Sequence, residues 1–155
     1  MDISPLARAV IKRGTILHSD EFDYVDHGKM FVVMGEDDTQ LYGFFFINSD
    51  INPKIWKDEK ALSMQMQLKK SNYPDILKYD SFLGCQSLLH ISKSELINQF
   101  SDGRAQYIGD LVEDDINMAL EAVRRSDLYS DYEKDTFFHY CPVKAGKSVF
   151  EIVET

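Results

Sequence analysis

The hydrophobic positions of the chain fall mostly into short runs that are typical of β-strands. Residues 15–18, 31–34 and 41–47 are rich in β-branched, aromatic and other apolar side chains. An acidic turn at residues 37–38 separates the second run from the third. We therefore predict a first strand at the first run and a β-hairpin over residues 29–47.

Strict alternation predicts a further strand in the middle of the chain. Four apolar side chains alternate with polar ones over residues 61–69, namely Leu62, Met64, Met66 and Leu68. Side chains of a strand point alternately to its two faces, so this period of two indicates a half-buried strand whose methionines face the core. The apolar residues within 81–91 and 104–111 predict additional strands.

Two segments carry helix signals instead. Ser92 and Glu95 have the spacing of a capping box, so we predict a short helix over residues 93–100. Residues 113–125 begin with three acidic side chains and end with two arginines, which complements the helix dipole at both ends. We expect the clearest helix there, and a further helical turn within residues 129–138.

These elements predict one α+β domain that is mainly β. The length of 155 residues suits a single hydrophobic core, and 44% hydrophobic with 28% charged residues is typical of a folded protein. The ends add a helical turn or an arm at residues 2–11 and an alternating edge strand at 149–153.

No apolar stretch reaches the roughly 18 residues of a membrane helix, and the N-terminus lacks the features of a signal peptide. We expect a cytoplasmic protein that does not enter a membrane.

Charge and cysteine content narrow the function classes. A formal charge of −9 disfavours nonspecific binding to nucleic acid, because phosphates are bound mainly by Lys and Arg. A local basic cleft on an acidic protein remains compatible with such binding. Cys85 and Cys141 lie outside any metal-binding spacing, so we interpret both as packing residues. We predict no cofactor and no metal site.

Three segments of the chain follow one another in a characteristic order. Arg13-Gly14-Thr15-Ile16 is similar to an Arg-Gly-Asp-Ile strand, and residues 27–34 resemble a glycine-basic-Arg-Pro-Val-Val-Val strand. Residues 80–123 contain an Asp-led strand, a short helix, a Gly-x-Leu and a closing helix. Over about residues 12–126 this order resembles the MazF/PemK family of growth-inhibitor toxins, which leaves 127–155 as a C-terminal extension. The resemblance implies a small SH3-like barrel with one short helix and one C-terminal helix.

The resemblance also implies an activity and partners. In this family single-stranded RNA is cut without a metal when a ribose 2′-OH attacks the adjacent phosphorus. That reaction needs a base, an acid and positive charge at the developing phosphorane. Family members usually form homodimers and are neutralised by a small antitoxin protein. The candidate partners are therefore single-stranded RNA, an antitoxin and a second copy of this chain.

The catalytic positions of the family are partly kept. The arginine-proline pair of its second strand falls at about Met30-Phe31, and Lys29 is the adjacent basic residue. A one-residue offset on a strand would place Lys29 on the face opposite that arginine, so Lys29 is either a phosphate ligand or a solvated strand-end lysine. Ser49 falls at the family's Thr/Ser position after the third strand. There it would either donate a hydrogen bond to phosphate or cap a turn beside Asn48 and Asp50.

Further candidates lie in predicted loops. His27 precedes the second strand, and its ordinary pKa near neutrality suits an acid or a base; a plain surface histidine is the alternative. Lys54, Trp56 and Lys57 interleave basic and aromatic side chains, as in proteins that stack nucleic-acid bases. The alternative is that Trp56 anchors its loop to the core.

Two functions are compatible with these residues. The first is a toxin-like, metal-independent endoribonuclease that uses Ser49 with Lys29 or His27. The second is a non-catalytic protein-interaction module that keeps the barrel but has lost the family's catalytic arginine. The charge of −9 and the replaced arginine favour the second function, whereas the retained serine favours the first.

Overall fold

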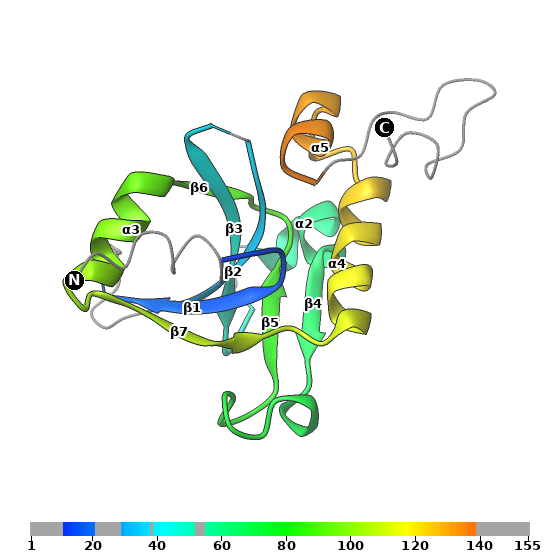
Figure 1. Cartoon of the computed structure of the whole chain (residues 1–155). Helices are drawn as coiled ribbons and strands as arrows, with labels where there is room; N and C mark the ends of the chain where they lie inside the picture. Colours follow the sequence, from blue (N-terminus) through cyan, green and yellow to red (C-terminus); the bar gives the residue numbers. More distant parts are fainter. Residues whose placement is uncertain (1–10, 21–28, 38, 52–54, 139–155) are drawn as a thin grey trace.

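An antiparallel sheet lies at the centre of the structure, a computed structural model that describes residues 11–20, 29–37, 39–51 and 55–138 (Figure 1). Within these ranges the sheet has seven strands. They are β1 (Thr15–Ser19), β2 (Lys29–Glu36), β3 (Leu41–Asn48), β4 (Gln65–Leu68), β5 (Ser81–Gly84), β6 (Leu89–Ser92) and β7 (Ala105–Asp110).

The described strands form an open sheet. Their order is β4-β5-β3-β2-β1-β7, and β6 pairs with β3 off this path. Strands β4 and β7 are the two ends of the path and do not pair with each other within the described residues. The predicted α+β class, mainly β, is confirmed, whereas these strands do not close into a barrel.

Four α-helices and two short 3₁₀ turns complete the described part of the chain. The helices are α2 (Glu59–Ser63), α3 (Lys93–Ser101), α4 (Glu113–Arg125) and α5 (Asp131–Phe138), and the turns are η1 (Ile55–Lys57) and η2 (Lys70–Asn72). The predicted N-cap of α3 is confirmed, because the Ser92 hydroxyl accepts a hydrogen bond from the Glu95 backbone N–H at 3.2 Å. The acidic start and basic end of α4 also lie where the sequence predicts them.

The predicted strand over residues 61–69 is wrong in its first half. The Asp58 carboxylate accepts backbone hydrogen bonds from Lys60 and Ala61 at 3.1 and 3.2 Å, and this N-cap starts helix α2. The strand begins only at Gln65. Its apolar side chains nevertheless face the core, as predicted.

Side chains of the β2–β3 hairpin alternate between two hydrophobic clusters. Phe31, Val33 and Phe44 pack with Leu96 and Ile97 of α3 on one face. The opposite face, which we call the helix-covered face, packs against α4 and α5 and includes Val32, Met34, Phe45, Leu120, Val123, Phe137 and Phe138. Figure 1 shows α3 on one side of the sheet and α4 with α5 on the other. The described part of the C-terminal extension therefore belongs to the main core.

Several predictions concern residues that the structure does not describe. His27, Lys54 and Cys141, the segment 2–10 and the strand at 149–153 lie outside the described ranges. Cys85 is described and fully buried, as expected of a packing residue. None of the described helices combines the length and the apolar character that crossing a bilayer requires.

Candidate functional site

Lys29 lies at one end of two central strands of the sheet, where β2 begins and β3 ends. Its ammonium donates a hydrogen bond to the Asn48 side-chain oxygen and lies 5.2 Å from the centre of the Phe46 ring. Partial burial lowers the pKa of Lys29 below the ordinary value for lysine. Phe82, which pairs with Asn48 from β5, is half-buried on the same face. A cation, an amide and two aromatic rings thus share one surface.

A one-residue bulge in β2 decides which side chain faces Lys29. Near the turn, Glu36 pairs with Tyr42, but beyond the shift between Val33 and Gly35 the register changes by one residue, and Phe31 pairs with Phe46. Continued to the strand end, this register places Lys29 opposite Asn48. Without the bulge the same hairpin would place Lys29 opposite Ser49.

Strand alternation also settles the face to which Lys29 belongs. Met30, which the sequence resemblance aligns with the family's arginine, packs against the core of the helix-covered face. Lys29 therefore points to the other face, the one that α3 covers in part. His18 pairs with Met30 across β1 and β2, so it points away from the Lys29 side chain.

Two hydrogen-bonded pairs of polar side chains lie at this end of the sheet, on or just after β2, β3, β5 and β4. Lys29 bonds to Asn48, and Gln65 at the start of β4 donates to the side-chain oxygen of Gln86, just after β5. Asn48 and Gln86 meet above Gly84, where the missing side chain leaves room for both amides. We call Lys29, Asn48, Gln86 and Gln65 the polar row. All four side chains are half-buried.

Of the other predicted site residues, the structure describes Ser49, Trp56 and Lys57. Ser49 follows Asn48 in an exposed bend. Trp56 and Lys57 lie in η1 and are exposed, so the interpretation of Trp56 as a core anchor is wrong, since 61% of its surface is accessible. No hydrogen bond or ion pair within the described ranges connects Ser49, Trp56 or Lys57 to Lys29.

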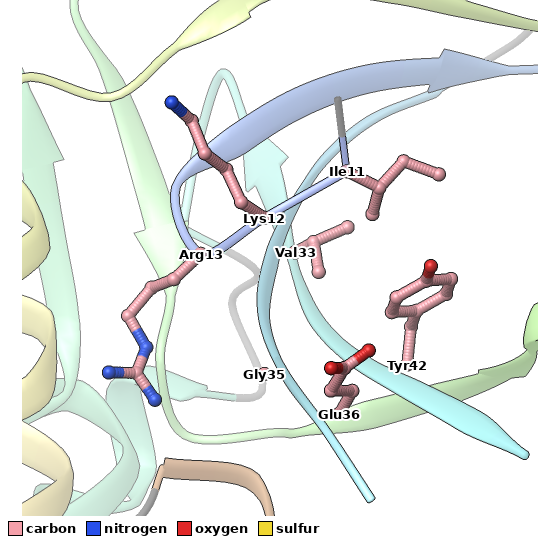
Figure 2. Close-up of a pocket in the computed structure, with 7 residues that line it drawn as sticks. All are labelled: Ile11, Lys12, Arg13, Val33, Gly35, Glu36 and Tyr42. Carbon is pink, nitrogen blue, oxygen red and sulfur yellow. The ribbon is translucent and has the colours of Figure 1, made fainter. Parts of the chain in front are cut away.

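A cavity near the start of the described chain is less suited to phosphate. It measures about 240 Å³ and is lined by Ile11, Lys12, Arg13, Val33, Gly35, Glu36 and Tyr42. Figure 2 shows the side chains of Lys12 and Arg13 pointing away from the apolar residues and from Glu36. Arg13 donates to the Met34 carbonyl at 2.8 Å, and Glu36 pairs with Lys93 at 2.9 Å. The acidic group at this cavity would repel an anion.

A groove of about 810 Å³ runs between α2, β4 and α4. Its charged side chains pair with one another, Lys60 with Asp127 at 2.7 Å and Arg125 with Glu121 at 2.8 Å. The charges therefore balance within the groove, and nothing in it selects a phosphate. Among the described residues, no group of three His, Cys, Asp or Glu side chains is placed to hold a metal ion.

The polar row can bind an anionic, hydrogen-bonding ligand. Lys29 supplies positive charge in a partly desolvated position, where electrostatic interactions are stronger than in bulk water. The amides supply donors and acceptors, and the half-buried Phe46 and Phe82 rings add apolar surface beside them. The sequence offered Lys29 as a candidate but missed Asn48, Gln86 and Gln65, because only the pairing of β2, β3, β5 and β4 brings them together.

The description of a lysine at a strand end beside neighbouring amides and aromatic rings rests on the geometry of this chain alone. No protein-family model matches the chain, and no curated protein matches it.

Proposed function

We propose that the chain is a divergent MazF/PemK-like toxin that binds single-stranded RNA at the polar row and cleaves it without a metal. The observation that carries the proposal is the contact between Lys29 and Asn48 beside Phe46. In the family an arginine of the second strand acts with a Thr or Ser after the third strand. Here Lys29 and Asn48 each lie one residue before these positions, at the start of β2 and the end of β3. We interpret their contact as a substitute for the family's pair, and the open sheet as a relative of the SH3-like barrel.

The proposed chemistry assigns a distinct task to each group. The Lys29 ammonium stabilises the negative charge that develops on the phosphorane when the ribose 2′-OH attacks phosphorus. Asn48 orients that ammonium, and Ser49 stays a predicted hydrogen-bond donor to a phosphate oxygen. The attack forms a 2′,3′-cyclic phosphate and breaks the bond from phosphorus to the 5′ oxygen. His27 stays the predicted acid or base, which either takes the 2′-OH proton or protonates the leaving 5′ oxygen, while water transfers the other proton. A homodimer and an antitoxin partner are part of the same proposal.

Cleavage of a long, unstructured RNA in EDTA tests the function. We expect the purified full chain to produce discrete fragments, and Lys29→Met to lower the cleavage rate about 100-fold, as the loss of one transition-state charge contact does elsewhere. Lys134→Met is the matched control. Lys134 is also half-buried and bonds one oxygen, the Arg124 carbonyl at 3.1 Å, but it lies on α5.

The control should cut RNA at the wild-type rate. Equal cleavage by the wild type and Lys29→Met would remove Lys29 from the mechanism. A wild-type chain that neither binds nor cuts RNA would refute the RNA proposal as a whole.

A binding module without catalysis is the second candidate function. It is favoured by one observation: within the described polar row, Lys29 is the sole titratable side chain, so no second group there serves as its acid or base. RNA that binds tightly to the wild type, survives intact and is released by Lys29→Met would favour this function over the nuclease.

A further inference from the structure

Two side-chain amides of the polar row end at the same point above Gly84. A Cβ atom built on Gly84 would lie 3.5 Å from Asn48 Nδ2 and 3.7 Å from Gln86 Nε2. One nitrogen comes from β3 and the other from the segment after β5, and the Gln86 side-chain oxygen lies nearer still to the same point, at 3.2 Å. Their hydrogen-bond partners decide what they present there.

The orientation of Asn48 follows from Lys29. A lysine ammonium can only donate hydrogen bonds, so the Asn48 amide must turn its oxygen toward Lys29. Its nitrogen, the donor, is then the atom that faces Gly84. The contact to Lys29 thus fixes a donor at this position.

The orientation of Gln86 follows from a backbone carbonyl. The Ala61 carbonyl can only accept, so it fixes the Gln65 side-chain nitrogen toward itself at 3.2 Å. The same nitrogen donates to the Gln86 side-chain oxygen. The Gln86 nitrogen takes no part in this hydrogen bond, and it is a second donor within 3.7 Å of the Cβ position of Gly84.

Neither donor has a partner among the described residues, and both are reached by solvent. No hydrogen bond of Asn48 Nδ2 or Gln86 Nε2 to a described residue is found, although every fully buried side-chain nitrogen and oxygen of the described residues has a partner. Two donors that lie within 3.7 Å of the same point and are reached by solvent can together bind an acceptor atom on their solvent side. The Lys29 ammonium, bound to the same Asn48 amide, adds positive charge beside it.

We infer that Asn48 Nδ2 and Gln86 Nε2 together bind an acceptor oxygen of single-stranded RNA. The inference rests on the proposed function and adds a positioning contact beside Lys29. The oxygen is either a non-bridging phosphate oxygen or a base carbonyl. Amide side chains serve both kinds of contact, but only a contact to the base carries sequence information.

Binding of uncleavable RNA distinguishes the two sources. We would measure fluorescence anisotropy with labelled 2′-O-methyl oligonucleotides of uridine, cytidine and adenosine, since the 2′-O-methyl group removes the attacking hydroxyl. Uracil and cytosine carry carbonyl oxygens, whereas adenine carries none. The variants are Gly84→Ala, which puts a methyl group between the donors, and Gln86→Ala, which removes one donor.

Both variants should fold. The methyl group of Gly84→Ala would meet only the ends of flexible side chains, the nearest being Gln86 Oε1 at 3.2 Å. We expect each variant to weaken binding about 5- to 10-fold, the factor that corresponds to one or two neutral hydrogen bonds. Gln106→Ala, an exposed glutamine on β7, is the matched control and should bind like the wild type.

Each outcome decides one point. Weaker binding of uridine and cytidine oligonucleotides, with adenosine binding unchanged, assigns the donors to a base carbonyl. Equal weakening for all three assigns them to phosphate. Wild-type affinity in both variants would overturn the donor pair while leaving the RNA proposal intact. A wild type that binds none of the three would overturn both.

Discussion

The helix-covered face and the polar row occupy opposite sides of the same hairpin, and they are built in opposite ways. On the helix-covered face, a Cβ built on Gly35 would lie only 1.5 Å from the Phe137 carbonyl oxygen, so α5 rests directly on the β2 backbone. Arg13 reinforces this contact by donating to the Met34 and Phe137 carbonyls at 2.8 and 3.5 Å. The polar row, in contrast, keeps two amide donors open to solvent.

The difference separates residues that hold the fold from residues that are available to a ligand. Contacts between backbone and close-packed side chains leave no room for adjustment, so changes there act on stability. Half-buried polar side chains contribute little to stability but can exchange water for a ligand atom. Variants on the two sides should therefore affect different measurements.

The largest effect is expected from Gly35→Ala. The new methyl group cannot coexist with the Phe137 carbonyl, so α5 must move and expose Phe137 and Phe138, which are 4% and 1% accessible. Loss of two buried aromatic side chains should lower the free energy of unfolding by about 3–5 kcal/mol. Urea denaturation followed by circular dichroism measures this.

Gly84→Ala is the control for the added methyl group. It lies in β5 and meets only flexible side-chain ends, so its urea midpoint should stay close to that of the wild type. A Gly35→Ala protein as stable as Gly84→Ala would show that α5 does not rest on β2.

A smaller loss is expected from Tyr73→Phe. The buried Tyr73 hydroxyl donates to the Asp115 carboxylate at 2.5 Å and accepts from the Val112 backbone N–H at 3.0 Å, which ties η2 to the start of α4. Removing it leaves a buried carboxylate and an N–H without this partner, at a cost of about 1–3 kcal/mol. Tyr79→Phe, at an exposed tyrosine, should leave the denaturation curve unchanged.

Alkaline pH should weaken the helix-covered face. Burial raises the pKa of Cys85 and of Tyr73 well above their ordinary values. The unfolded chain releases these protons from about pH 8.5 for cysteine and about pH 10 for tyrosine, while the folded chain keeps them. The unfolded state then binds fewer protons, so the free energy of unfolding falls as pH rises through this range.

Urea midpoints at pH 7, 9 and 10.5 would measure this loss. Tyr73→Phe should make the decrease between pH 9 and 10.5 smaller, because this variant lacks the hydroxyl group whose pKa burial raises. A midpoint that is constant up to pH 10.5 would contradict the burial of these groups in the folded chain.

The smallest effect on stability is expected from Lys29→Met. The substitution removes a hydrogen bond to Asn48 but also removes a partly desolvated charge, and burial lowers the pKa of Lys29. These two contributions oppose each other, so we expect a change within about 1 kcal/mol. Loss of RNA cleavage without loss of stability would sharpen the contrast between the two sides. A strongly destabilised Lys29→Met would instead make Lys29 part of the structural core.

Local signals predicted most of the elements. The N-cap Ser92, the charged ends of α4 and the apolar runs of β2 and β3 each act within a few residues, so the sequence displays them directly. The alternation over residues 61–69 is also a local signal, and it predicted the burial of Met64, Met66 and Leu68 correctly. It gave the wrong secondary structure for the first part of the segment, because the Asp58 N-cap starts a helix there. Local capping outweighed periodicity there.

The candidate site was predicted less completely because it depends on contacts distant in sequence. Lys29 could be predicted as a candidate because it is a basic residue at a strand start. Its partner Asn48 could not be predicted, because the bulge in β2 determines which residue of β3 lies opposite Lys29. Gln65 and Gln86 are ordinary polar residues in sequence, and only the pairing of β4 with β5 brings them to Asn48. The sequence around Trp56 likewise does not indicate that its side chain is exposed.

The bulge between Val33 and Gly35 gives this hairpin a property beyond its shape. The bulge sets the pairing register of the hairpin. Because of this one extra residue in β2, Lys29 contacts the amide of Asn48 rather than the hydroxyl of Ser49. The same bulge contains Gly35, on which α5 rests. The docking of a helix on one face and the identity of the side chain beside a lysine on the other are therefore linked by a single insertion.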